Sequence, residues 1–369
     1  MIPEKVEFDG KTNLRVKELG SGDIPGWKQY VDESPKATFY HRIEWKQIIE
    51  KSFRHKTYYL IAERPLNNPI NSINSTNSIN PIVGILPMVH IKSLIFGSIF
   101  CSMPFLNFGG VCADDDEAER ALILAAEKIM REQKGDYIEF RHLRPSSTNL
   151  MGKTHKLSMT LELARDPEAL WSKFSSKHRQ TIRKAAKNGL EVRFGKKELL
   201  NDFYTIICQG WRDLGTPIYS NTFFENIMDL LRDSVEICLV TYQGKPIATA
   251  FVGLFKKTVE GMWLSFLRES AKLQTNYFQY WEMIKRACEK GYDEFHLGRS
   301  TVEGGGELFK EKWNAIPKQL YWEYILNRCE TIPELNVQNP KYQFAIRAWR
   351  RLPLPVTKML GPILAKSIP

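Results

Sequence analysis

The chain has 369 residues, which is enough for two or three domains with sizeable cores. Hydrophobic residues make up 43% of it and charged residues 25%, a composition that excludes a disordered or fibrous protein. The formal net charge of +10 favours anionic partners.

The segment from Met1 to Glu7 is too polar for a secretory signal, and prolines and a lysine interrupt the apolar region 81–111, which excludes a spanning helix there. We therefore expect a cytoplasmic protein. The six cysteines include no C-x-x-C pair, and the seven histidines include no H-x-H or H-E-x-x-H spacing. We expect reduced core cysteines, no metal ion and no tightly bound cofactor.

The first predicted unit contains a hairpin with strands at 58–63 and 81–86, a helix at 116–133 and, after Gly135, a buried strand at 136–143. The segment 67–81 inside the hairpin is rich in Asn and Ser, so we expect a solvated loop there rather than a binding lid. A second loop, 104–110, combines aromatic residues with glycines, and Asn107 is its candidate substrate-binding residue.

The same order of elements occurs a second time. Strands at 237–242 and 246–251 precede a helix at 277–289 and, after Gly291, a buried strand at 293–297. The sequence therefore predicts an α/β (α+β) protein of two tandem units, with mixed central sheets flanked by helices. We place the first domain at 1–160, the second, with the main site, at 161–330, and a C-terminal arm at 331–369.

Six cations and no acidic residue lie between Lys173 and Lys187, beside a narrow apolar stripe. The pattern predicts one amphipathic helix with a wide basic face. Its residues Arg179, Arg183 and Lys184 are candidates for binding substrate phosphates, such as those of a nucleotide or RNA. The alternative is a solvated surface helix, although such helices usually carry charges of both signs.

The C-terminal arm mixes cations with apolar residues, and no acidic residue follows Glu334. This mixture suits an anionic membrane surface. It suits equally an arm that packs its apolar residues on the protein and leaves its cations in water. Three prolines, Pro353, Pro355 and Pro362, exclude one long helix and favour the packed arm.

The segment from Gly210 to Ser220 follows a predicted helix at 199–208 and is rich in turn-forming residues. A structural turn needs its glycines and proline, but it does not need Arg212 and Tyr219 as well. We therefore expect these two side chains to contact substrate.

The strand that stops at Gly298 carries the strongest candidate site. Arg299 and Ser300 follow it directly, and a glycine-rich turn then leads to Lys310 and Trp313. Ligands bind at strand ends in α/β folds, and glycine allows the backbone to approach a substrate closely. The cations indicate a substrate that is anionic or becomes so during reaction. A strand, a loop and a helix with ordinary surface charges are the alternative.

His296 lies two residues before Gly298, so both are expected on one face of the strand. This position makes His296 a candidate for proton transfer. A structural histidine with satisfied hydrogen bonds is the alternative.

Four segments in order resemble the FemAB family, and more closely its branch found with bacterial exopolysaccharide and protein-sorting (PEP-CTERM) systems. They are K-H-R-Q-T-I-R-K-A-A-K-N-G-L-E-V at 177–192, W-R-D-L-G-T-P at 211–217, F-H-L-G-R-S at 295–300 and F-K-E-K-W at 309–313. The resemblance extends over about residues 38–326. It implies two tandem GNAT-like acyltransferase domains, in agreement with the repeated units.

FemAB members of assigned activity transfer an amino acid from aminoacyl-tRNA to an amine of a peptidoglycan precursor, and other relatives are acyl-CoA N-acyltransferases. The resemblance therefore implies one of these two acyl donors. It also implies that Lys310 lies near the reacting acyl group. The segment 270–276 before the second-unit helix lacks a glycine-rich pyrophosphate loop.

These observations predict an N-acyltransferase that acts on an amine of a cell-envelope or exopolysaccharide precursor without a covalent enzyme intermediate. Lys310 would stabilise the oxyanion or the leaving group, and Arg299 and Ser300 would hold substrate. The expected partners are a phosphate-bearing small or lipid-linked sugar or peptide substrate, tRNA, and the inner membrane surface through the arm. An acyl-CoA-dependent enzyme for a small molecule and a non-catalytic binder of RNA or another anionic polymer are the alternatives.

Overall fold

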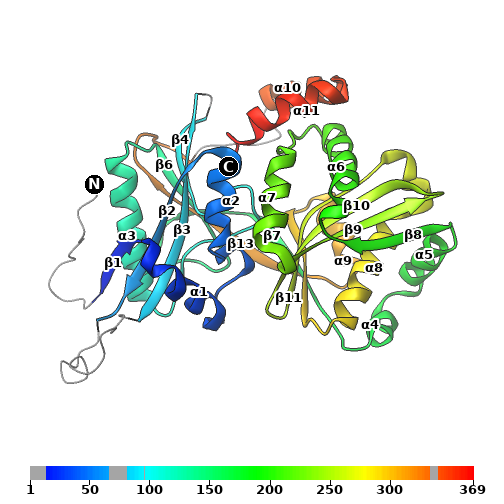
Figure 1. Ribbon diagram of the computed structural model, residues 1–369, viewed down its shortest axis with the longest axis horizontal. Coiled ribbons are helices and arrows are strands. Elements are labelled where there is room, and N and C mark those ends of the chain that lie inside the picture. The colour runs from blue at the N-terminus through cyan, green and yellow to red at the C-terminus, as the bar shows by residue number, and fades with distance from the viewer. Residues whose placement is uncertain (1–13, 66–80, 95, 333–339) are drawn as a thin grey trace.

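The computed structural model describes residues 14–65, 81–94, 96–332 and 340–369. Almost all of the predicted loop at 67–81, and residues 333–339 of the arm, lie outside these ranges. The described residues form two α/β halves that lie side by side, with a pair of helices across the top (Figure 1).

The α-helices are α1 (Ile24–Glu33), α2 (Glu44–Phe53), α3 (Asp116–Glu132), α4 (Pro167–Lys173), α5 (Ser176–Ala186), α6 (Leu200–Leu214), α7 (Asn221–Leu231), α8 (Thr275–Glu289), α9 (Gly305–Glu311), α10 (Pro340–Arg351) and α11 (Leu354–Ala365). Short 3-10 helices lie at Ser21–Asp23, Phe39–His41, Lys197–Leu199, Arg232–Ser234 and Arg268–Leu273.

The strands are β1 (Arg15–Glu18), β2 (Lys56–Glu63), β3 (Ile82–Ser93), β4 (Gly97–Cys101), β5 (Cys112–Ala113), β6 (Tyr137–His142), β7 (Met151–Glu162), β8 (Leu190–Gly195), β9 (Val235–Tyr242), β10 (Lys245–Phe255), β11 (Thr258–Phe266), β12 (Glu294–Thr301) and β13 (Ile316–Leu326). They form one mixed sheet in the order β1-β2-β3-β4-β6-β13-β7-β12-β11-β10-β9-β8, and β5 pairs with β3.

Each half contains the same local arrangement, a strand paired in parallel with the strand that follows the long helix. In the first half β4 pairs with β6, and in the second half β11 pairs with β12. The other pairings within each half are antiparallel. The repeated α/β unit and the mixed sheet that the sequence predicts are therefore confirmed.

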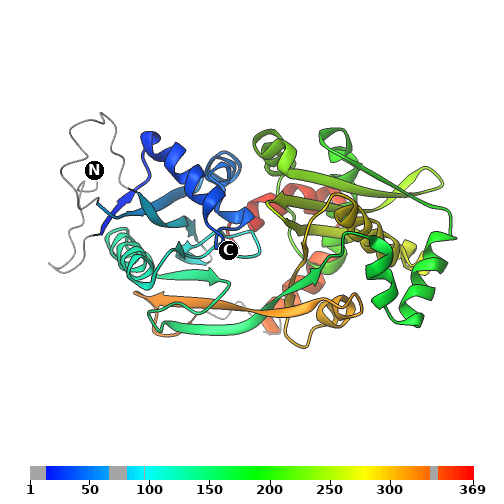
Figure 2. The same cartoon turned by 90° about the horizontal axis from the view of Figure 1, so that it is seen from below.

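Strands β7 and β13 join the two halves into one sheet. β13 pairs with β6 of the first half on one side and with β7 on the other, and β7 continues to β12. The view from below shows these two strands running together from the first half into the second (Figure 2). The last strand of the second half is thus hydrogen bonded to the first half.

The largest hydrophobic core is shared between the halves. It contains Trp27 and Phe39 from the first half and Phe203 and Trp263 from the second. Two smaller cores lie in one half each. Because burial of apolar surface dominates folding free energy, this shared core fixes the position of the halves relative to each other.

Helix α6 is longer than predicted, because Gly210 does not end it. A Cβ atom at Gly210 would lie 1.7 Å from Ser265 Oγ, so glycine is needed for close packing of α6 on β11. The helix ends instead at Gly215, which has a φ of +82° and is its left-handed cap. Arg212 therefore lies in a helix rather than in a turn.

The basic segment is also divided differently from the prediction. Helix α4 ends at Lys173, and a new helix begins after Ser175, whose side chain accepts a hydrogen bond from the N–H of His178. Serine is a preferred N-cap residue because its hydroxyl satisfies a free N–H of the first turn. The prediction of one helix from Lys173 to Lys187 is thus wrong at its start.

Helices α10 and α11 pack against α6. Gly215 allows this contact, because a Cβ atom there would lie 2.5 Å from Ile346. Among the described residues, no helix is both long and apolar enough to span a bilayer.

Candidate active site

The parallel strands β11 and β12 separate part of the way along their length. They pair only from Thr258 to Glu260 on β11 and from Glu294 to His296 on β12. Beyond this point the pairing of β12 with β7 shifts between His296 and Arg299. A bulge of this kind re-aims the side chains that follow it.

Gly298 makes the bulge possible. Its φ is +83°, and a Cβ atom there would lie 2.9 Å from the carbonyl oxygen of Gly261 on β11. A larger residue would therefore be strained and would also push the two strands apart. The sequence prediction was a close approach of the backbone to a substrate, whereas the close approach in the structure is to the neighbouring strand.

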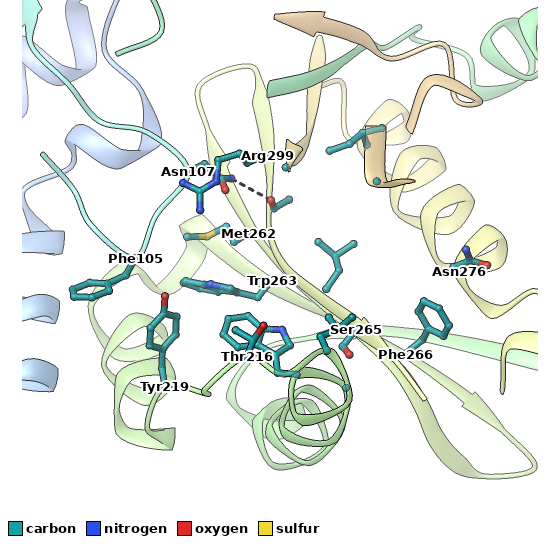
Figure 3. A pocket seen from close by; sticks show the side chains of 18 of the residues that line it. Phe105, Asn107, Thr216, Tyr219, Met262, Trp263, Ser265, Phe266, Asn276 and Arg299 are labelled. Atoms are coloured by element: carbon teal, nitrogen blue, oxygen red, sulfur yellow. Dashed lines mark hydrogen bonds between the residues drawn. The ribbon is translucent and has the colours of Figure 1, made fainter. Parts of the chain in front are cut away.

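The separated strands open into a cavity of about 750 Å³. Its walls come from β11 and β12, from α6, from the first turns of α8, from α9, from the loop 105–107 of the first half and from the end of the chain. In Figure 3, Phe105, Tyr219 and Trp263 lie toward one end of this cavity, and Asn276 on α8 lies toward the other. The cavity thus brings together both halves of the protein.

Lys310 lines this cavity and is only 8% exposed. Its Nζ donates hydrogen bonds to Gly298 O at 2.8 Å, Arg299 O at 3.1 Å and Ser300 Oγ at 3.1 Å. These bonds use all three N–H donors of an ammonium group. Burial, together with the charge of Arg299, lowers the pKa of Lys310 to about 8.

Arg299 follows the bulge and lines the cavity. Its Nη1 donates to Leu106 O at 3.4 Å, and its guanidinium lies 5.1 Å from the ring centre of Trp322. Burial and the nearby charge of Arg141 lower the pKa of Arg299 to about 10. Within the described residues, neither the half-buried Arg299 nor the buried Lys310 has a direct carboxylate partner. Both cations line this part of the site, which favours an anionic group between them.

The first half contributes Asn107 to the cavity. Its Nδ2 donates to Tyr40 Oη at 2.9 Å and to Gly261 O at 3.4 Å. Tyr40 in turn donates to Glu260 at 3.1 Å, and Glu260 lies 2.7 Å from Nδ1 of His296. A buried polar chain therefore leads from the cavity into the sheet.

Tyr219 lies in the aromatic part of the wall. Its ring contacts those of Phe53, Phe105, Trp211 and Trp263, with centroids 5.6 to 6.4 Å apart. Burial raises the pKa of Tyr219 to about 12, so its hydroxyl stays neutral and can donate a hydrogen bond.

His296 does not line this cavity, although Gly298 does, because the bulge between them breaks the alternation of side chains. The ring lines a second cavity of about 500 Å³ on the other side of the strand separation. Both ring nitrogens lie near carboxylates, Nδ1 at 2.7 Å from Glu260 and Nε2 at 3.2 Å from Glu294. Burial opposes its charge, but the two carboxylates prevail and raise the pKa of His296 to about 9. At this pKa its imidazole is charged at neutral pH, which disfavours proton abstraction by His296.

Trp313 and Arg212 also lie outside the cavity lining. Trp313 is fully buried in the second-half core, where its ring contacts His178 and Tyr280. Arg212 donates two hydrogen bonds to the neighbouring Asp213, which does line the cavity. The sequence pattern does not distinguish a tryptophan of the core from one of a binding site.

The basic helix α5 lies on the surface and is not part of the lining. Arg183 and Lys184 are exposed. Arg179 is half-buried and donates to Ser172 O at 2.9 Å. Any phosphate that these cations bind therefore belongs to a part of the ligand outside the cavity.

Sequence reasoning missed several lining residues. Ser265 comes from β11, which was not predicted as a strand of the site, and Asn276, Gln279 and Tyr280 come from α8. The spacing of the last three, which places them on one helix face, is the signal that could have found them. Gln279 is 1% exposed, and its Nε2 has no hydrogen-bond partner within the described part of the chain. This amide is a buried donor available to a ligand.

Comparison with known proteins agrees with this geometry. The model of the acetyltransferase (GNAT) domain family matches residues 172–311, which include β11, α8, β12 and Lys310. Residues 172–311 form a GNAT acyltransferase domain. No curated protein sequence matches the chain at a significant level.

Solved structures extend the similarity to most of the chain. FemX has a TM-score of 0.60 at 12% identity, with 90% of this chain and 99% of FemX covered. The C-terminal domain of a putative lysylphosphatidylglycerol synthetase from Agrobacterium fabrum has a TM-score of 0.55 at 12% identity, with 83% and 92% covered. A tandem GNAT protein from the clavulanic acid biosynthesis pathway has a TM-score of 0.52 at 10% identity, with 86% and 100% covered. The predicted tandem GNAT-like fold is therefore confirmed, and the chain is an acyltransferase by its GNAT domain.

Proposed function

We propose that this protein transfers an acyl group from an activated donor to an amine of an anionic cell-envelope or exopolysaccharide precursor. The observation that carries the proposal is the cavity at the β11 and β12 separation, where a bulged backbone, Lys310 and Arg299 meet. It is a partly apolar space next to one buried and one half-buried cation. Such a site strengthens electrostatic interactions with a developing negative charge.

In the proposed reaction, the nitrogen lone pair of the amine attacks the acyl carbonyl carbon. The carbonyl oxygen becomes an oxyanion, and collapse of this intermediate forms the amide and releases the oxygen or sulfur leaving group. The proton lost from nitrogen is passed to the leaving group. No bond to the protein forms at any stage.

Two features support stabilisation of the oxyanion. The pairing of β11 with β10 skips Met262, and because the extra residue of a bulge is left unpaired, we assign the N–H of Met262 as an oxyanion donor. Lys310 supplies a positive charge nearby. Of its three acceptors, only the Ser300 hydroxyl can rotate away, so we assign Ser300 as the group that a substrate oxygen displaces.

The remaining lining residues are assigned to substrate binding. Arg299 would bind an anionic group, and Tyr219 and Asn107 would supply hydrogen bonds at the end formed by the first half. Gln279 would bind a carbonyl or hydroxyl group with its unpaired amide. We assign His296 as a positioning residue, because its charge fixes Glu260 and thereby Tyr40 and Asn107.

The donor in this proposal is aminoacyl-tRNA or acyl-CoA. The exposed cations of α5 lie outside the cavity, and they suit the phosphates of a large donor such as tRNA. An acyl-CoA-dependent enzyme for a small molecule is the second candidate. The place of Asn276, in the first turn of α8, in the cavity lining favours it, because helix N-termini bind phosphates.

We propose that the protein works in the cytoplasm at the inner face of the membrane, in contact with it through the arm. We also propose that the first domain, 1–160, supports the acceptor, and that the second domain, 161–330, carries out the chemistry. The contribution of Asn107 to the cavity supports this division.

The test is a transfer assay with two donor classes. The purified full-length chain is incubated with radiolabelled acetyl-CoA or with tRNA charged with labelled amino acids, and with soluble or lipid-extracted envelope precursors. We expect one donor to give an alkali-stable label on an amine. Absence of labelled amide with both donors and all precursor fractions would contradict the proposal.

A non-catalytic binder of RNA is the competing function that α5 favours. The salt dependence of RNA affinity separates the two. A binder whose whole function lies in α5 should lose affinity steeply with salt and should show no transfer from either donor.

A further inference from the structure

The arm formed by α10 and α11 has a fixed inner face. Trp349 of α10 is 8% exposed, and Arg350 donates to Leu214 O at 3.1 Å. On α11, Gly361 packs against Ile218, and directly after this helix Lys366 O lies 2.7 Å from Nε2 of His55. The arm is thus a built part of the surface, so its outer face has a defined position.

The outer face of the arm combines large exposed apolar side chains with cations. Phe344 is 71% exposed, Met359 65% and Ile363 58%. Arg347 and Arg351 lie three and seven positions after Phe344, which places them on the same side of α10. Met359 and Ile363 are four residues apart and likewise share one side of α11.

This combination is concentrated at one place. Of the eleven large hydrophobic side chains that are exposed within the described ranges, four lie on the arm or at the adjoining end of α6, where Leu214 is 60% exposed. Apolar residues beside cations, without any acidic residue after Glu334, match the chemistry of an anionic bilayer surface.

The charge also argues against a second copy of this chain as the occupant. Two such faces in contact would bring Arg347 and Arg351 of each copy against cations of the other, with no carboxylate from either arm. Like charges that meet across an interface cost free energy. An anionic lipid surface has no such penalty.

The arm adjoins the cavity through its inner side and the end of the chain. Ala365, which is only 4% exposed, Ile368 and Pro369 line the cavity together with the neighbouring Leu214 of α6. We propose that the outer face of α10 and α11 docks on an anionic lipid bilayer. We further propose, resting on the proposed function, that docking presents the cavity to an acceptor whose lipid anchor stays in the bilayer.

The test uses sedimentation of the full-length chain with vesicles of phosphatidylcholine alone or mixed with phosphatidylglycerol. We compare Phe344→Asp/Met359→Asp with a matched control, Leu124→Asp/Met151→Asp, which changes two exposed apolar residues of the first half. A second comparison sets Arg347→Glu/Arg351→Glu against Lys51→Glu/Lys128→Glu, which reverses two exposed cations elsewhere. Thermal unfolding checks that each variant is folded.

We expect the wild-type chain and both controls to bind the phosphatidylglycerol vesicles. The affinity of each arm variant for these vesicles should be lower by about tenfold or more. The wild-type chain should bind neutral vesicles poorly. Equal binding by the arm variants and their controls would overturn the proposal. So would a failure of the wild-type chain to bind, or self-association that only the arm variants lose. Since vesicle binding needs no turnover, its outcome is independent of the acyl-transfer assay.

Discussion

The ammonium of Lys310 lies 2.8 Å from the carbonyl oxygen of Gly298, the residue at which β12 bulges away from its regular pairing. A bulge leaves carbonyl groups without a ladder partner, and an unpaired buried carbonyl costs free energy. Lys310 donates to two carbonyl groups at the bulge, on Gly298 and Arg299, and so brings a positive charge to it. The same lysine therefore stabilises the backbone of the site and supplies charge to it.

Gly298→Ala should damage both the fold and the site. The residue would be strained at a φ of +83°, and its Cβ would lie 2.9 Å from Gly261 O. We expect a loss of unfolding free energy of about 1–3 kcal/mol, and weaker donor binding. Urea unfolding measures the first effect. Gly305→Ala is the matched control, because nothing lies within 4 Å of a Cβ atom there, and it should be neutral or stabilising. A wild-type stability for Gly298→Ala would show that the bulge tolerates a side chain.

The charge of His296 should contribute stability that depends on pH. Its pKa is raised to about 9, so the contribution is fully present below the unfolded pKa of about 6.5 and is lost as the pH rises through about 9. The difference in unfolding free energy between wild type and His296→Gln should therefore be larger at about pH 6 than at about pH 10. Denaturant unfolding at both pH values measures it. The same difference at both would mean that the imidazole is neutral in the fold.

Turnover should decline above about pH 8. Lys310 has a pKa of about 8, so its ammonium, and the positive charge next to the oxyanion, are lost above that value. Deprotonation of the acceptor amine over the same pH range would by itself raise kcat. A decline in kcat can therefore not come from the acceptor. A pH profile of kcat measures it. The decline should be absent in Lys310→Arg, whose guanidinium stays charged. An unbroken rise of wild-type kcat to about pH 10 would exclude a catalytic role of the ammonium.

The basic face of α5 should bind donor phosphates. Arg183→Glu/Lys184→Glu should weaken binding of aminoacyl-tRNA and reduce the slope of log affinity against log salt by about one or two, with little change in melting temperature. Filter binding over a range of salt concentrations measures this. Lys51→Glu/Lys128→Glu carries the same change in net charge at other exposed positions. If both pairs reduce affinity equally, the effect comes from net charge and not from α5.

Local patterns in the sequence predict the repeated unit and the strand end of the site. Two features of the repeated unit can be recognised from residues that are adjacent in sequence. They are the glycines that end the two long helices and the apolar runs of β6 and β12. For the same reason Gly298, Arg299 and Lys310 can be recognised from the order of residues around them. The fold brings these three together, as expected.

Other parts of the site depend on contacts between distant segments. The opening between β11 and β12 results from where their pairing stops, and no local pattern of residues specifies that point. Asn107 reaches the cavity only because the halves share a core. Trp313 was expected at the site and lies in the core, because an aromatic residue suits either place.

Composition alone does not decide between the two predicted roles of the arm. Trp349 and Ile346 face the protein, whereas Phe344 faces solvent on the same helix. The composition of the arm includes the residues of both faces together. Only the packing on α6 shows which residues face the protein and which face solvent.

The central claim is that acyl transfer occurs in the cavity beside the charge of Lys310. The most direct test is the rate of amide formation by Lys310→Ala relative to Lys312→Ala, an exposed lysine two residues further on. We predict that Lys310→Ala lowers kcat by about a hundredfold or more with little change in KM, and that Lys312→Ala has wild-type kinetics. A folded Lys310→Ala protein with a near-normal kcat would contradict the account.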